Sequence, residues 1–116
     1  MILDIVKKYK PIIKTFAIQK FKKVRNAYQL MCKISFVNHS ELYIKDYLFL
    51  DGTRKYSFHW QNDRKECIIR WDNAPHHQNK VSTFPFHKHM GKDEIIVESK
   101  PMRIENIFNY IHSEIT

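Results

Sequence analysis

The N-terminal segment mixes apolar residues and lysines at helical spacing. In ILDIVKKYKPIIKTFAIQKFKKVRNAY, which covers residues 2–28, the recurring apolar positions are Ile2, Ile5, Val6, Tyr9, Ile13, Phe16, Ala17 and Val24. This spacing predicts an amphipathic helix, or two short ones, with lysines on the outer side. Pro11 has no backbone N–H, so it should kink the helix or begin the second one.

From Tyr28 to Asp72 the apolar residues follow a period of two, and β-branched and aromatic residues dominate. Turn signals at NHS (38–40), DG (51–52) and NDRK (62–65) divide this region into four runs. Short runs separated by such turns predict strands joined by hairpins. The expected topology is an antiparallel meander.

Assumed loop lengths determine which residues share a face of this sheet. With two-residue loops at 38–39 and 51–52 and a four-residue loop at 62–65, an apolar face is predicted that only Lys45 interrupts. Its members are Leu30, Cys32, Ile34, Phe36, Tyr43, Tyr47, Phe49, Tyr56, Phe58, Trp60, Cys67, Ile69 and Trp71. Such a face needs a covering layer to exclude water, and we expect the terminal helices to provide it.

Beyond Asp72 the chain becomes irregular before regular elements return. Pro75 and Pro85 predict an irregular segment over 73–91, EIIVES (94–99) predicts a short strand, and Ile104, Ile107, Phe108 and Ile111 predict a closing helix. We therefore expect one domain over 1–116 with an α+β fold. It consists of a four- to five-stranded antiparallel sheet with N-terminal and C-terminal helices packed on its apolar face.

The opposite face of the predicted sheet carries polar side chains. They are Lys33, Ser35, Asp46, Ser57, His59, Gln61, Arg70 and Asp72, mixed with Ile44, Leu48 and Ile68. In this register Asp46, Ser57 and Arg70 form one cross-strand row, with His59 one step from Arg70. The row leads into residues 70–90, which contain four of the seven histidines.

The positive charge of the chain is concentrated at its start. The formal net charge is +8, and residues 1–25 contain eight Lys and Arg against one acid, Asp4. A cationic segment attracts phosphates or an acidic protein surface, although a solvated helix face has the same composition. The predicted nucleic-acid-binding residues are Lys7, Lys14, Lys20, Lys22, Lys23, Arg25 and Lys88.

Imidazoles beside an arginine suit the cleavage of RNA, in which one imidazole takes the 2′-hydroxyl proton and another protonates the leaving oxygen. A fixed guanidinium would stabilise the charge that develops on phosphorus. The predicted catalytic residues are His59, Arg70, Asp72, His76, His77, His87, His89 and Asp46. We expect no cofactor or metal, because thiolate or acidic ligands at regular zinc-site spacing are missing. Two alternatives stay open: a non-catalytic protein that binds nucleic acid or the ribosome, and a histidine loop organised by a metal.

Two further patterns concern the compartment. Cys32 and Cys67 share no short motif, which favours reduced core thiols over a disulfide. No apolar run approaches the roughly 18 residues that cross a bilayer, and lysines interrupt the N-terminal apolar stretch. We expect a cytoplasmic protein without membrane contact.

Three motifs together give the chain a family resemblance: YSFHWQN, IIRWDNAPHH and FPFHKH, in this order and spacing. They resemble the TumE-like toxins of prokaryotic toxin–antitoxin modules, whose Leu-x-Ile-x-Glu-Tyr run is similar to LYIKDY here. The residues that match the family are Tyr56, His59, Arg70, Asp72, Pro75, His76, His77, Pro85, His87 and His89. Asp46 stands where the family tends to have glutamate, so the charge is kept and the reach is shorter. Residues 62–66 lack the Asp-Gly turn of relatives.

The resemblance implies an intracellular toxin that acts on RNA or translation, and a helix-turn-helix antitoxin encoded beside it. We expect the antitoxin to mask the polar face or to cover the cationic N-terminal helix, since a surface that binds phosphate also attracts carboxylates. The charges that this hypothesis tests are Lys7, Lys14, Lys20, Lys22 and Arg25.

Overall fold

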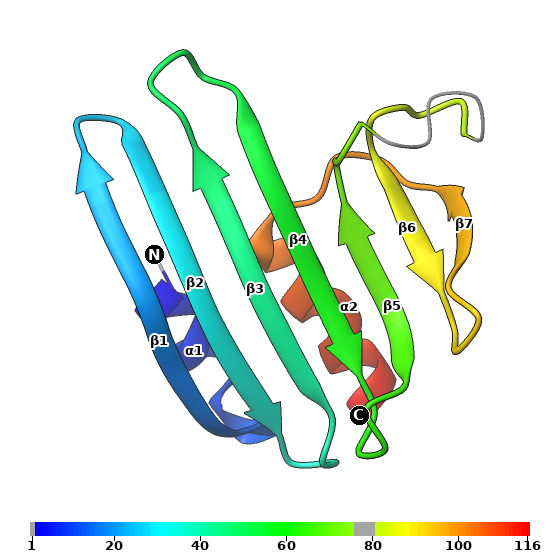
Figure 1. Cartoon of the computed structure of the whole chain (residues 1–116). Coiled ribbons are helices and arrows are strands. Elements are labelled where there is room, and N and C mark those ends of the chain that lie inside the picture. Colours follow the sequence, from blue (N-terminus) through cyan, green and yellow to red (C-terminus); the bar gives the residue numbers. More distant parts are fainter. Residues whose placement is uncertain (1, 76–80) are drawn as a thin grey trace.

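The computed structural model describes residues 2–75 and 81–116, which form two helices, one short 3-10 helix and a single sheet (Figure 1). In chain order the elements are α1 (Ile2–Lys8), η1 (Lys10–Ile12), β1 (Ile13–Val24), β2 (Ala27–Phe36), β3 (Glu41–Leu48), β4 (Arg54–Gln61), β5 (Cys67–Asp72), β6 (His87–Met90), β7 (Ile95–Glu98) and α2 (Ile104–Ile115). The predicted α+β meander is confirmed. The sheet has seven strands, however, and not four or five.

Both helices lie on the same side of the sheet, behind it in Figure 1. The predicted apolar stripe of α2 is confirmed, because Ile104, Ile107, Phe108 and Ile111 are all buried. The Phe108 ring lies 5.5 Å from the Tyr9 ring and 6.0 Å from the Phe36 ring. We call the side of the sheet under the helices the helix face and the other side the open face. Within 2–75 and 81–116 there is no helix with the length and apolar content to cross a membrane.

Residues 13–24 form the edge strand β1, where a helix was predicted. Register shifts between Ile13 and Thr15 and between Ile18 and Lys20 interrupt the pairing of β1 with β2. Each shift displaces the alternation of side chains by one residue. Phe16, Ile18 and Phe21 therefore all pair with buried residues of β2 despite their uneven spacing. This spacing resembles that of a helix, which explains the wrong prediction.

Strand β6 lies inside the segment that was predicted to be irregular. Its sequence, HKHM, has little strand propensity of its own. It is held by pairing with β5 on one side and with β7 on the other. The predicted strand near residues 94–99 is confirmed as β7. Because His87 and His89 are two residues apart on an extended strand, their rings point to the same side.

Counted between the closing backbone pairs Phe36–Ser40 and Phe49–Thr53, the loops after β2 and β3 each contain three residues and not two. Ile34 pairs with Leu42, and Leu48 pairs with Arg54. His39 and Gly52, at φ 70° and φ 87°, take the left-handed conformation that closes such loops. A loop longer by one residue turns every side chain of the next strand to the other face.

Strand β3 is consequently inverted relative to the prediction. Leu42, Ile44 and Asp46 lie on the helix face, whereas Tyr43, Lys45 and Tyr47 lie on the open face. Lys45 therefore does not interrupt the apolar surface. The extra residue in the second loop reverses this shift, so the side chains of β4 lie on the predicted faces. Tyr56, Phe58 and Trp60 are buried as expected.

The two cysteines are free thiols. Cys32 is buried in the core as predicted, and this burial raises the pKa of its thiol to about 12. Cys67 is partly exposed, and burial raises the pKa of its thiol as well.

The three-residue loop after β2 can be tested by glycine substitution. His39→Gly should raise the free energy of unfolding by up to about 1 kcal/mol, because glycine adopts φ 70° without a steric penalty. His39→Ala should not be stabilising. Denaturant unfolding followed by circular dichroism measures both.

Asn38→Gly is the matched control within the same loop. The Asn38 side chain accepts hydrogen bonds from the backbone N–H and the hydroxyl of Ser40, so its loss should lower the free energy of unfolding. In a two-residue loop both central residues would have positive φ, and glycine would then stabilise at Asn38 too.

Candidate functional site

Two adjacent cross-strand rows bring the predicted site residues together on the open face. One row runs Tyr43, His59, Arg70 and His89 on β3 to β6. The next row runs Lys45, Ser57, Asp72 and His87 on the same four strands. The expected sharing of one face by Ser57, His59, Arg70 and Asp72 is confirmed, and β6 adds two imidazoles from a segment far along the chain.

Asp72 is the centre of this cluster and contacts three charged or chargeable groups. Its Oδ1 lies 2.7 Å from His87 Nε2, and its Oδ2 lies 3.4 Å from His89 Nε2 and 3.5 Å from Arg70 Nε. Oδ1 also accepts a hydrogen bond from the backbone N–H of Ala74 at 3.1 Å. The Asp72 side chain is 11% exposed, so these contacts replace most of its hydration.

His87 is enclosed, with 1% of its surface exposed. Its Nδ1 lies 2.9 Å from the carbonyl oxygen of Pro85, an acceptor, so Nδ1 carries a proton. Its Nε2 then faces the Asp72 carboxylate. That contact is favourable when Nε2 also carries a proton or when both atoms bind the same cation.

The same cluster has a donor set that can hold a metal ion. One atom each from Asp72, His87 and His89 lie within 4.8 Å of one another. Two imidazoles and a carboxylate are ligands that suit iron or zinc. These three residues have no regular metal-site spacing along the chain, because it is the sheet that brings Asp72 of β5 beside the two histidines of β6.

Arg70 has a second acidic neighbour that the sequence did not indicate. Its Nη1 lies 2.9 Å from Glu94 Oε1, and Glu94 lies in the turn between β6 and β7. The Arg70 side chain remains 33% exposed on the open face. Its guanidinium is thus oriented by carboxylates at one end and accessible to a ligand.

The imidazoles on either side of Arg70 have lowered pKa values. Burial lowers the pKa of His59, and the charge of Arg70 lowers it further. Burial and Arg70 also lower the pKa of His89, while Asp72 partly opposes this effect. Both rings are therefore neutral near pH 7 and are able to accept a proton.

A hollow of about 280 Å³ lies beside this cluster on the sheet. It is lined by Lys45, Lys55, Tyr56, Ser57, Arg70, Asp72, Asn73 and Ala74. Lys45 and Lys55 were not predicted as site residues. The two-residue loop assumed after β2 placed Lys45 on the wrong face. The hollow therefore combines three cationic side chains with one carboxylate.

Asp46 does not belong to the cluster, and the predicted row of Asp46, Ser57 and Arg70 is wrong, because Ser57 pairs with Asp72 and Arg70 with His59. Asp46 pairs with Tyr56 on the helix face. There its carboxylate lies 3.0 Å from Arg54 Nη2 and accepts a hydrogen bond from the Tyr28 hydroxyl at 3.2 Å. Arg54 also donates to the carbonyl oxygen of Met102 at 2.9 Å, which links β3, β4 and the start of α2.

The predicted N-terminal helix is confined to residues 2–8, and the charges assigned to it are divided between α1, β1 and the turn after β1. Lys7 is in α1, Arg25 is in the turn after β1, and Lys14 borders a hollow against α1. Lys23 is paired with Tyr28, whereas Lys20 and Lys22 are paired with Met31 and Gln29 on the open face.

Two other predictions concern the segment around β6. Lys88 is paired with Trp71 and so lies on the side of β6 opposite His87 and His89. His76 and His77 lie outside the described residues, so their predicted roles stay predictions.

Comparison with known proteins supports the resemblance seen in the motifs. The family model described as Toxin TumE matches residues 2–116. No curated protein and no solved structure gives a significant match. Because the family match covers nearly the whole chain, this protein belongs to the TumE toxin family.

Proposed function

We propose that this toxin is a metal-independent endoribonuclease whose scissile phosphate lies against Arg70 on the open face. The observation that carries the proposal is the accessible Arg70 guanidinium beside the neutral His59 ring and next to a lysine-lined hollow. The strong net positive charge of +8 favours a polyanionic substrate.

The reaction that suits these groups is an internal transfer within RNA. The His59 ring takes the proton of a ribose 2′-hydroxyl, and the oxygen forms a bond to phosphorus. The bond from phosphorus to the 5′-oxygen breaks, and a second imidazole gives that oxygen a proton. The products are a 2′,3′-cyclic phosphate and a 5′-hydroxyl. Arg70 offsets the negative charge that develops on the phosphoryl oxygens.

Asp72, His87 and His89 act as positioning residues in this mechanism. His87 and His89 are 1% and 6% exposed, which leaves them little access to RNA. Asp72 contacts Arg70 Nε and both imidazoles, so it fixes the direction of the guanidinium. The second imidazole of the reaction is predicted to be His76 or His77, which the family resemblance also identifies.

Membership of a toxin family implies a cognate antitoxin. We infer a cytoplasmic complex with a helix-turn-helix antitoxin, one segment of which is apolar and acidic and adds to the free edge of β1. On this strand Phe16, Ile18 and Phe21 are 42%, 42% and 52% exposed. An edge strand with exposed apolar side chains is a template for another strand. A second copy of this chain fits less well, because two lysine-rich strands would repel each other.

Cleavage should depend on His59 and Arg70. His59→Ala should lower the cleavage rate by roughly 100- to 10,000-fold, and Arg70→Ala by roughly 100- to 1,000-fold. The measurement is cleavage of RNA by purified protein with EDTA present, with analysis of the new ends for a cyclic phosphate.

Asp46→Asn is the matched control. It removes the ion pair with Arg54 on the helix face and should lower the free energy of unfolding, while the folded protein still cleaves RNA. If EDTA abolishes cleavage and a divalent cation restores it, the metal-independent mechanism is wrong. If the wild type is toxic but cleaves no RNA, the hypothesis of a non-catalytic protein that binds nucleic acid or the ribosome replaces the endoribonuclease.

The lowered pKa of His59 should affect the pH dependence of the free energy of unfolding and the pH dependence of RNA cleavage. An unfolded histidine titrates near about 6.5, so between that pH and the lower folded pKa the unfolded chain binds more protons. The contribution of His59 to the free energy of unfolding is present above about 6.5 and is lost as the pH falls through the folded pKa.

Unfolding of the wild type and of His59→Gln across pH 5 to 7.5, a range around the usual histidine pKa of about 6.5, measures this effect. The variant should lose less stability on acidification. The acid limb of kcat/KM for the wild type should lie below about 6.5. Equal pH dependence of the two proteins would contradict a lowered pKa for His59.

The lysines of β1 lie on different faces of the sheet, so their substitution should affect antitoxin binding and RNA binding differently. Lys14→Glu with Lys23→Glu should slow antitoxin association by at least roughly tenfold at low salt and leave RNA binding unchanged. Lys20→Glu with Lys22→Glu, on the open face, should weaken both interactions. Stopped-flow association and RNA titration measure them. Unchanged antitoxin association in both double variants would exclude β1 as the contact.

A further inference from the structure

The open face has a second set of surface groups that extends away from Arg70. Tyr43 and Tyr47 of β3 and Phe49, the residue after this strand, occupy alternate positions directed to this face, and Lys45 lies between the two tyrosines. Tyr43 and Phe49 are 37% and 40% exposed. At about 3.3 Å per residue, the two tyrosines stand roughly 13 Å apart along the strand.

Lysines from three neighbouring strands lie against these rings. Lys33 Nζ is 5.6 Å from the centre of the Tyr43 ring. Lys20 Nζ and Lys45 Nζ are 5.6 Å and 5.3 Å from the centre of the Tyr47 ring. Tyr43 thus has one cation against its ring and Tyr47 has two, and these contacts orient the rings within a positively charged surface.

The charge on this part of the sheet is almost entirely positive. The two paired rows that cross β1 to β4 contain Lys20, Lys22, Lys45 and Lys55, together with Gln29, Met31, Tyr47 and Ser57, and none of these residues is acidic. Near Tyr43, the Glu41 carboxylate forms an ion pair with Lys33 at 2.8 Å. This surface is complementary to a polyanion.

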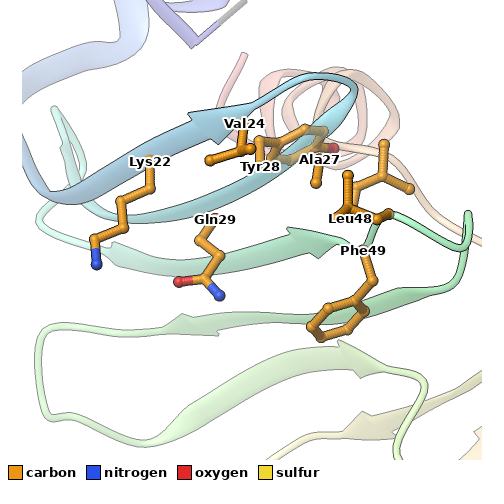
Figure 2. Close-up of a pocket in the computed structure, with 8 residues that line it drawn as sticks. Lys22, Val24, Ala27, Tyr28, Gln29, Leu48 and Phe49 are labelled. Atoms are coloured by element: carbon orange, nitrogen blue, oxygen red, sulfur yellow. The ribbon is translucent and has the colours of Figure 1, made fainter.

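The aromatic surface meets the Arg70 cluster at one end and a hollow at the other. At one end the Tyr43 ring lies 6.5 Å from the His59 ring, next to Arg70. At the other end the Tyr47 ring lies 6.5 Å from the Phe49 ring. Figure 2 shows Lys22, Gln29 and Phe49 projecting to the same side of the sheet. These residues help to line a hollow of about 310 Å³.

We propose that the open face over β1 to β4 is a binding track for single-stranded RNA, with bases stacked on Tyr43, Tyr47 and Phe49 and the phosphates held by Lys20 and Lys45. This inference rests on the proposed function for its choice of RNA. Alternating rings and cations on a flat sheet fit a single strand, whose bases are free to stack, whereas the bases of a duplex are paired and stacked with one another. The track leads a bound strand to His59 and Arg70.

The test measures binding apart from cleavage. The probe is a fluorescent single-stranded oligonucleotide with 2′-O-methyl riboses, which cannot undergo attack by a 2′-hydroxyl. Tyr43→Leu and Tyr47→Leu should each weaken binding by roughly 5- to 150-fold. Lys45→Ala should reduce the slope of log affinity against log salt by about 0.7. The same sequence as a duplex should bind the wild type more weakly.

Tyr110→Leu is the matched control, because Tyr110 is also 37% exposed but lies on α2, on the other side of the molecule. It should bind the probe as the wild type does. Circular dichroism shows that each variant is folded.

The outcomes separate this inference from the proposed cleavage. Loss of probe binding in the tyrosine variants supports the track even if the wild type cleaves no RNA. Wild-type probe affinity in folded Tyr43→Leu and Tyr47→Leu overturns it even if RNA is cleaved. It is also overturned if these variants lose antitoxin binding alone, since the face would then recognise an acidic protein.

Discussion

The arrangement of the candidate site depends on the Asp72 carboxylate. A buried carboxylate that is not compensated costs several kcal/mol, and Asp72 is compensated by two imidazoles, one guanidinium and a backbone N–H. Three of these partners come from β6 or from the chain just after β5. The same contacts that stabilise the carboxylate therefore attach β6 to β5 and orient Arg70 toward the open face.

Each face of the sheet has an ion pair between an aspartate and an arginine, and the two pairs differ in their exposure to solvent. On the helix face, Asp46 and Arg54 form an ion pair that also ties the start of α2 to the sheet. On the open face, Asp72 and Arg70 are joined in a similar contact, but the guanidinium keeps access to solvent. The Asp46–Arg54 pair is therefore a buried contact within the fold, whereas the Arg70 side chain of the other pair remains 33% exposed.

The sequence predicted the fold class, the burial of β2 and β4, and the meeting of His59 and Arg70, since those elements have strict alternation of apolar residues. It did not predict the orientation of β3, because the backbone conformations of His39 and Gly52, which set the loop lengths, cannot be read from residue types alone. It also missed β1, where two register shifts disguise a strand, and β6, which forms by pairing with its neighbours. Glu94 was missed because β6 was missed, since the turn after β6 brings Glu94 to Arg70.

The lengths of the strands suggest where the folded protein opens most easily. β1 to β4 contain 8 to 12 residues each, whereas β6 and β7 contain 4 each, at one edge of the sheet. Short edge elements have few hydrogen bonds to lose and undergo local unfolding at lower free energy than the rest of a domain. Separation of β6 from β5 would remove His87 and His89 from Asp72 while the remaining strands and both helices stay in place. If the protein cleaves RNA as proposed, opening of this four-residue strand would withdraw the contacts that orient Arg70, and amide hydrogen exchange reports such opening separately from global unfolding.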